Sequence, residues 1–135
     1  MYANPHATKA YRHSAAEHVV DTADGYTLVR SLMTRLIARL AMAKHCIAQN
    51  DIASKGEHLS QAINIIDVLQ VAVDERHNPK LAENLIGLYD YMSRQLLSAN
   101  LHNDVALIDE VDGLVRQVKE AWDAIGTTEQ ELGNG

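Results

Sequence analysis

The sequence is poor in several residue types: it has no phenylalanine, two prolines and a single cysteine in 135 residues. Strands usually draw on aromatic and β-branched residues, so a chain rich in Ala, Leu, Ile and Val without phenylalanine favours packed helices. The lone Cys46 cannot form an internal disulfide, which fits a reducing compartment. The length suits one domain that buries its own core. We therefore expect a single all-α domain.

Clustered basic residues and long apolar runs are also missing. The formal net charge is -6, whereas phosphate binding needs grouped Lys and Arg. The first residues, MYANPHATKAYRH, contain no basic stretch followed by an apolar one, and no apolar run reaches membrane-spanning length. We therefore expect a cytoplasmic protein with no nucleic-acid partner and no membrane insertion.

Caps and helix breakers predict five helical segments. Ser14 and Glu17 form an S-x-x-E capping box for a short first helix. Four long helices have further boundary signals: Asp24 as N-cap and Asn50 as end of the second segment, Asp51 opening the third, Asn78 with Pro79 opening the fourth, and Gly126 ending the last. The predicted organisation is a flexible segment over 1–13, a helical domain over 14–126 and a disordered tail over 127–135.

Apolar residues recur every three or four positions along each long segment, which places them on one helix face. The four stripes are Val29, Met33, Leu36, Leu40, Ala43 and Ile47; Leu59, Ile63, Ile66, Leu69 and Val73; Leu81, Leu85, Leu88, Met92, Gln95 or Leu96, and Ala99; and Ile108, Val111, Val115, Val118, Trp122 and Ile125. Short breaks between long helices imply antiparallel neighbours. The predicted fold is an antiparallel up-and-down four-helix bundle with a short N-terminal helix as an appendage.

Patterns that support catalysis are absent from the sequence. Di-metal enzymes built on four-helix bundles need Glu-x-x-His on two helices, and this pattern does not occur. The isolated glycines lack the spacing of a phosphate-binding loop. His45 and Cys46 are adjacent on a helix and point about 100° apart, so they cannot pair as base and nucleophile. We expect a protein that is not an enzyme and that has no cofactor and no metal.

The helices carry more apolar residues than one core stripe requires. The surplus consists of Ile65, Val68 and Ala72, of Ile86 and Leu97, and of Leu107 and Leu114. Two interpretations are open: these residues pack in a wide core or beneath the N-terminal segment, or they form a hydrophobic groove for an amphipathic helix of a partner. The second interpretation predicts that charged substitutions at Ile65 or Val68 weaken partner binding and leave helicity intact.

The segment LAENLIGLYDYMSRQLLSANLHN, residues 81–103, resembles the signature of the flagellar secretion chaperone family, FliS. The shared elements are AENL at 82–85, LYDYM at 88–92, AN-x-x-ND at 99–104, KAY at 9–11, AINIID at 62–67 and AW at 121–122. The resemblance implies a four-helix bundle that binds the C-terminal segment of flagellin in the cytosol, prevents premature polymerisation and keeps flagellin competent for the flagellar export gate. The residues also leave open a generic helical adaptor of the secretion apparatus that binds another amphipathic helix.

The resemblance also indicates candidate contact residues. Tyr11 matches a family tyrosine thought to lie over part of the groove, although a tyrosine there also suits a staple for the short first helix. Tyr89 and Tyr91 lie about 200° apart on their helix, so one is expected inside and the other outside. Together with the surplus apolar residues and the family's polar positions, the candidate flagellin-binding set is Tyr11, Ile65, Val68, Ala72, Asn84, Tyr89, Tyr91, Leu97, Asn100, Asn103 and Leu107.

Two segments depart from the family pattern. The usual Ser-Pro before the second helix is Asp24-Gly25 here, which keeps a cap but loses the proline. The common MLYDG or MLFDG of that helix is SLMTR at 31–35, so its aromatic and its acid are missing. These changes bear on packing and contacts near that helix, and the expected fold is unaffected.

Overall fold

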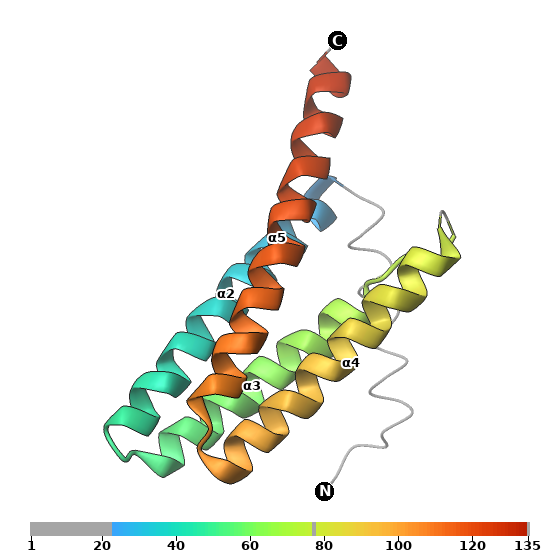
Figure 1. Ribbon diagram of the computed structural model, residues 1–135. Helices are drawn as coiled ribbons and strands as arrows, with labels where there is room; N and C mark the ends of the chain where they lie inside the picture. The colour runs from blue at the N-terminus through green and yellow to red at the C-terminus, as the bar shows by residue number, and fades with distance from the viewer. Residues whose placement is uncertain (1–22, 77, 135) are drawn as a thin grey trace, which may run out of the picture.

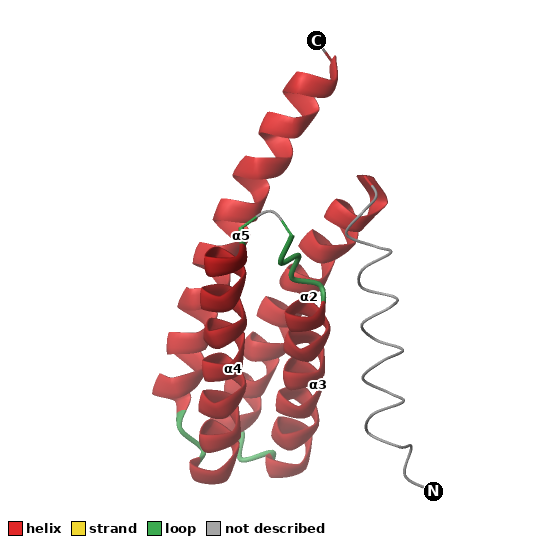
Figure 2. Ribbon diagram, turned by 90° about the vertical axis from the view of Figure 1, so that its right-hand side faces the viewer, coloured by secondary structure: helices red, strands yellow, loops and turns green. Residues whose placement is uncertain are grey.

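The computed structural model describes residues 23–76 and 78–134, with side chains between residues 25 and 126. These residues form four helices, α2 (Ala23–Ala48), α3 (Ile52–Val71), α4 (Pro79–His102) and α5 (Val105–Asn134), and no strand. The helices alternate in direction along the chain (Figures 1 and 2). The predicted all-α four-helix bundle is confirmed. The short helix predicted from Ser14, the segment 1–13 and Tyr11 lie outside the described residues.

Each helix packs against two neighbours. α2 contacts α3 and α5, and α4 contacts the same two helices, while the diagonal pairs of these four helices make no backbone contact. The bundle therefore has a square cross-section, with its core along the central axis. The α2–α3 and α4–α5 turns lie together at one end, and the α3–α4 loop lies at the other (Figure 2).

The predicted stripes supply most of the core. Leu36, Leu40, Leu59, Ile66, Met92, Leu96, Ile108 and Val111 are the largest fully buried side chains among the described residues. Two predicted core residues are wrong: Leu81 is 61% exposed and Ile125 is 53% exposed. Both residues lie at the end of the bundle that carries the α3–α4 loop. α3 ends before this level, so it does not cover their side chains.

Two of the predicted helix starts are confirmed in atomic detail. The side chain of Asp51 accepts a hydrogen bond from the backbone N–H of Ser54 at 3.2 Å. Asn78 does the same for Leu81 at 3.1 Å, and Pro79 occupies the first turn, where its missing N–H is not needed. These caps fix where α3 and α4 begin.

Two predicted helix boundaries are wrong. α2 already begins at Ala23, so Asp24 lies within the helix instead of capping it. α5 does not end at Gly126 but continues to Asn134, so most of the segment predicted as a disordered tail is helical. A glycine within a helix costs only about 1 kcal/mol relative to alanine, which is too little by itself to end a long helix.

Candidate partner-binding site

An apolar cavity of about 510 Å³ lies at the end of the bundle that carries the α3–α4 loop. All four described helices contribute to it. Its lining consists of Val29, Met33, Leu69, Ala72, Val73, Asp74, Asn78, Leu81, Ala82, Leu85, Tyr89, Val118, Ala121, Trp122 and Ile125. We call it the end cavity. Its volume falls in the ordinary range of about 300–1,000 Å³ for ligand sites.

The end cavity exists because α3 stops earlier than its neighbours. After Val71 the chain leaves the helix, and the carboxylate of Asp74 accepts hydrogen bonds from the backbone N–H of Arg76 at 2.9 Å and from its Nε at 3.0 Å. This contact fixes the loop before Asn78 starts α4. α5 continues well beyond the level of that loop (Figure 2), so the side chains of α4 and α5 there have no facing turn of α3.

The chemistry of the end cavity suits an apolar ligand. Asp74 and Asn78 supply its polar edge, and nearly all other lining atoms are carbon. Tyr89 is only 3% exposed, and burial raises the pKa of its phenol. Leu81 and Ile125 lie exposed among the lining residues, where an incoming side chain would meet them. The arrangement suits the apolar face of a helix or another apolar group.

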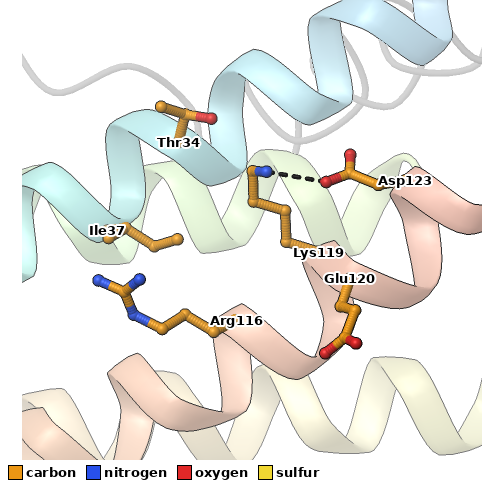
Figure 3. A pocket seen from close by; sticks show the side chains of 6 residues that line it. All are labelled: Thr34, Ile37, Arg116, Lys119, Glu120 and Asp123. Carbon is orange, nitrogen blue, oxygen red and sulfur yellow. Dashed lines mark hydrogen bonds and ion pairs between the residues drawn. The ribbon is translucent and has the colours of Figure 1, made fainter.

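A second hollow, of about 480 Å³, lies between α2 and α5 (Figure 3). It is lined by Thr34, Ile37, Arg116, Lys119, Glu120 and Asp123. Lys119 reaches toward Asp123, with Nζ 2.9 Å from Oδ2, and Arg30 Nε lies 3.1 Å from the other carboxylate oxygen. Thr34 belongs to the segment that departs from the family pattern. Because Lys119 pairs with Asp123 and Arg116 pairs with Asp112, most charges at this hollow already have partners, so it is a weaker candidate for a partner than the end cavity.

The end cavity unites two of the residues predicted as contacts, Ala72 and Tyr89. Val68 lies one turn before Ala72 on α3 and is half-buried. Ile65 is only 8% exposed and belongs to the core, which is the first of the two interpretations that the sequence leaves open for it. This face of α3 turns toward the centre of the square bundle, so Ile65 is not a surface contact for a partner.

The two tyrosines of α4 face in different directions, as predicted. Tyr89 is buried, whereas Tyr91 is 37% exposed and its hydroxyl donates a hydrogen bond to Oε1 of Glu110 on α5. This hydrogen bond raises the pKa of Tyr91. Tyr91 therefore joins α4 to α5 on the outside of the bundle and does not line the end cavity.

The remaining predicted contacts among the described residues do not line the end cavity. Leu97 is 58% exposed on α4, Leu107 is half-buried against the core on α5, and Asn84 is exposed on α4. Asn103 follows Tyr89 by 14 residues, which at 1.5 Å per residue is about 20 Å along the helix. The structure thus places Leu97, Asn103 and Leu107 near the α4–α5 turn, at the opposite end of the bundle.

Asn100 and Asn103 contact the one buried lysine of the described core. Lys55 is 3% exposed, and its Nζ donates to the backbone oxygen of Asn100 at 2.8 Å and to Oδ1 of Asn103 at 2.5 Å. Asn103 caps α4 in the left-handed conformation with φ 53°. At the α4–α5 corner Asn103 therefore has a structural role through its side chain and Asn100 through its backbone oxygen.

Sequence patterns missed several residues of the end cavity. The spacing of Leu81, Trp122 and Ile125 predicts core stripes, whereas all three line the end cavity. The available signal was the length of the stripes, because Leu81 and Ile125 continue them beyond the last residue of α3. Where an apolar stripe extends beyond the end of the facing helix, its last side chains have no partner helix and line a cavity.

Within residues 23–76 and 78–134, no group of three or more His, Cys, Asp or Glu side chains is placed to hold a metal ion. None of the helices there is both long and apolar enough to cross a membrane.

Known proteins resemble this chain over most of its length. A family model described as "Flagellar protein FliS" matches residues 7–129. A flagellar secretion chaperone FliS of Salmonella typhimurium is 42% identical over 118 residues, 87% of each chain. The flagellar secretion chaperone FliSB of Pseudomonas aeruginosa is 39% identical over 93% of this chain and 98% of its own length. A FliS of Bacillus subtilis is 32% identical over 78% of each chain.

Proposed function

The chain belongs to the FliS family of flagellar proteins, and on this premise we propose that it is a cytosolic export chaperone for flagellin. In this function it binds the C-terminal segment of flagellin, prevents premature polymerisation and keeps the subunit competent for type III secretion through the flagellar export gate. The relatives described above are named secretion chaperones. Membership of a chaperone family also confirms that the chain is not an enzyme.

The observation that supports flagellin binding is the end cavity. A disordered segment that folds on binding loses conformational entropy, so it must bury a large apolar surface to compensate. The end cavity offers an apolar volume of about 510 Å³ with exposed leucine and isoleucine side chains beside it. An amphipathic helix can insert its bulky apolar side chains there and extend its remaining face along the bundle.

Among the predicted contacts, the end cavity favours Ala72 and Tyr89 as anchors, with Val68 next to them on α3. α4 has 24 residues, a length of about 36 Å at 1.5 Å per residue. At about 100° per residue, Asn84 and Tyr91 lie within about 20° of the same face of α4, so a segment that leaves the end cavity along that face would reach both. Leu97 lies about 120° round the helix from Tyr91. These outer positions, with Leu107 on α5, are proposed as secondary contacts.

The function is tested by mixing the purified chain with flagellin and with flagellin that lacks its C-terminal segment. We expect a stable complex with intact flagellin only. Leu81→Glu and Ile125→Glu place a charge beside the end cavity at exposed positions, so they should weaken the complex while leaving helicity unchanged. The matched control is Leu28→Glu, because Leu28 is 44% exposed on α2 and does not line the end cavity. Equal binding of truncated and intact flagellin would contradict the proposal.

The sparse polar lining of the end cavity favours a second candidate function. In ligand sites, a few polar groups supply most of the specificity through hydrogen bonds. A cavity with so few polar groups can therefore distinguish apolar side chains mainly by their size. A generic adaptor that accepts amphipathic helices from other export substrates would use the same cavity. Binding to several unrelated export substrates with affinities similar to that for flagellin would favour this adaptor over a flagellin-specific chaperone.

A further inference from the structure

Tyr26 in the first turns of α2 and Trp122 of α5 hold each other by three interactions. Their rings stack with centroids 5.1 Å apart and an angle of 8° between planes. The indole Nε1 donates to the backbone oxygen of Tyr26 at 3.1 Å, and the Tyr26 hydroxyl donates to the backbone oxygen of Trp122 at 2.9 Å. Stacking of its ring and the hydrogen bond of Nε1 therefore fix the orientation of the indole.

Gly126 makes room for this pair. A Cβ atom at position 126 would lie 1.9 Å from Cζ and 2.1 Å from the hydroxyl oxygen of Tyr26, far inside van der Waals contact. Added Cβ atoms at Gly87 and Gly113 would meet nothing within 4 Å. The tip of the Tyr26 ring thus occupies the space of the missing side chain. We call Tyr26, Trp122 and Gly126 the aromatic clasp.

Only one member of the aromatic clasp lines the end cavity. Trp122 does so, whereas Tyr26 and Gly126 do not. Without the stacked phenol and the space that Gly126 leaves for it, the indole would lose its fixed rotamer and could turn into the cavity that it borders. If the Trp122 indole had to be ordered when the partner binds, the affinity would fall, because immobilising a side chain costs about 0.5–1.5 kcal/mol.

From this geometry we infer that Tyr26 and Gly126 are positioning residues for the partner, which they affect through Trp122 and do not touch. This inference rests on the proposed function, since it concerns the affinity of the end cavity for the flagellin C-terminal segment. Loss of the aromatic clasp should weaken binding of that segment roughly two- to tenfold. This is the change in affinity expected when one aromatic pair is lost or when one side chain must be immobilised on binding.

The test uses the full chain, a peptide of the flagellin C-terminal segment and Trp122 as a fluorescent reporter, since it is the only tryptophan in the sequence. Gly126→Ala should displace the Tyr26 ring, shift the Trp122 emission to longer wavelength and weaken peptide binding. Gly113→Ala is the matched control, because it adds the same methyl group to the same helix in open space. It should change neither the emission nor the affinity.

Two further variants separate positioning from general loss of structure. Tyr26→Phe keeps the stacked ring and should retain nearly wild-type affinity. Tyr26→Ala removes the ring and should weaken binding as Gly126→Ala does, and adding Gly126→Ala to Tyr26→Ala should weaken it no further, because the two changes act through one contact. Circular dichroism and denaturant midpoints establish that each variant is folded at the temperature of the binding assay.

The outcomes distinguish the inference from the proposed function. If the wild-type chain fails to bind the peptide, the proposed function is wrong and the inference falls with it. If the wild type binds and folded Gly126→Ala or Tyr26→Ala binds equally well, only the inference is overturned. Additive losses in the double variant would also overturn it, since they would mean that Tyr26 and Gly126 act separately.

Discussion

Nζ of Lys55 on α3 lies 2.5 Å from Oδ1 of Asn103, the residue that caps α4. The contact joins two helices at a position where Lys55 is nearly inaccessible to water. Asn103 was identified through the family signature, and its observed partner is the bundle itself. Asn103 of the AN-x-x-ND element thus has a structural explanation that requires no ligand.

Removal of the Lys55 amine should destabilise the bundle. Lys55→Met keeps most of the aliphatic chain but leaves the oxygens of Asn100 and Asn103 without their donor. An unsatisfied buried polar group costs about 1–3 kcal/mol, so we expect a loss of this size in the free energy of unfolding, measured by denaturant titration. Lys80→Met is the control, because Lys80 is exposed at the start of α4. A loss equal to that of the control would contradict the structural role.

The contribution of the Asn103 side chain can be separated from that of its backbone conformation. Asn50 and Asn103 both have positive φ, 58° and 53°, and glycine adopts this conformation without strain. Asn103→Gly should therefore destabilise the chain by about 1–2 kcal/mol through the lost hydrogen bond. Asn50→Gly should leave the unfolding free energy within about 0.5 kcal/mol of wild type, since Asn50 is exposed. Equal effects at the two positions would mean that Lys55 gains little from Asn103.

Stability should decline in alkaline solution through Tyr89. Burial raises the pKa of this phenol above its ordinary value of 10.0, so the folded chain holds the proton more tightly than the unfolded chain. The contribution of the neutral Tyr89 phenol to the free energy of unfolding is fully present below pH 10. It is lost as the pH rises toward the folded-state pKa. Lys44, whose pKa is raised by its hydrogen bond to Asp109, acts in the same direction.

The variant Tyr89→Phe shows how much of the stability lost at alkaline pH is due to ionisation of Tyr89. Denaturant midpoints of Tyr89→Phe should fall less steeply than those of the wild type as the pH increases beyond 10. Tyr91→Phe should flatten the profile less, because the Tyr91 pKa is raised by a hydrogen bond to Glu110 at an exposed position, where solvent screens the interaction. Parallel pH profiles for wild type and Tyr89→Phe would show that the Tyr89 phenol ionises without unfolding the bundle.

Charges on the two faces of α3 should have different effects. Ile65 is buried, so Ile65→Asp should destabilise the bundle by more than about 3 kcal/mol, since an unpaired charge would enter the core. Val68 is half-buried beside Ala72, so Val68→Asp should retain helicity and weaken binding of the flagellin segment. Circular dichroism and peptide titration measure the two effects. Unfolding by both variants would place Val68 in the core as well.

Two helix starts, those of α3 and α4, and the core face were predictable because they depend on local chemistry. Asp51 and Asn78 cap helices with their own side chains, and period alone placed Leu36 and Met92 in the core. Helix ends were less predictable. Gly126 was expected to end α5, but its missing side chain is filled by Tyr26, a residue 100 positions earlier in the chain. No local pattern contains that contact.

The candidate site was only partly predictable for a related reason. Periodicity says which face of a helix is apolar, but not how far the opposite helix extends. Ala72 and Tyr89 were predicted as contacts and do line the end cavity. Leu81 and Trp122 line it too, yet their spacing fits a core stripe equally well. Only the early end of α3 distinguishes a cavity wall from a core residue.

The square packing of the bundle has a consequence for how it folds. Three of its four helix interfaces join consecutive helices, and only α2 with α5 joins the first described helix to the last. Loop-closure entropy makes such a distant pairing the slowest to form. Tyr26 and Trp122, 96 residues apart, should therefore meet after the folding transition state. Loss of their contact should accelerate unfolding and leave the refolding rate nearly unchanged.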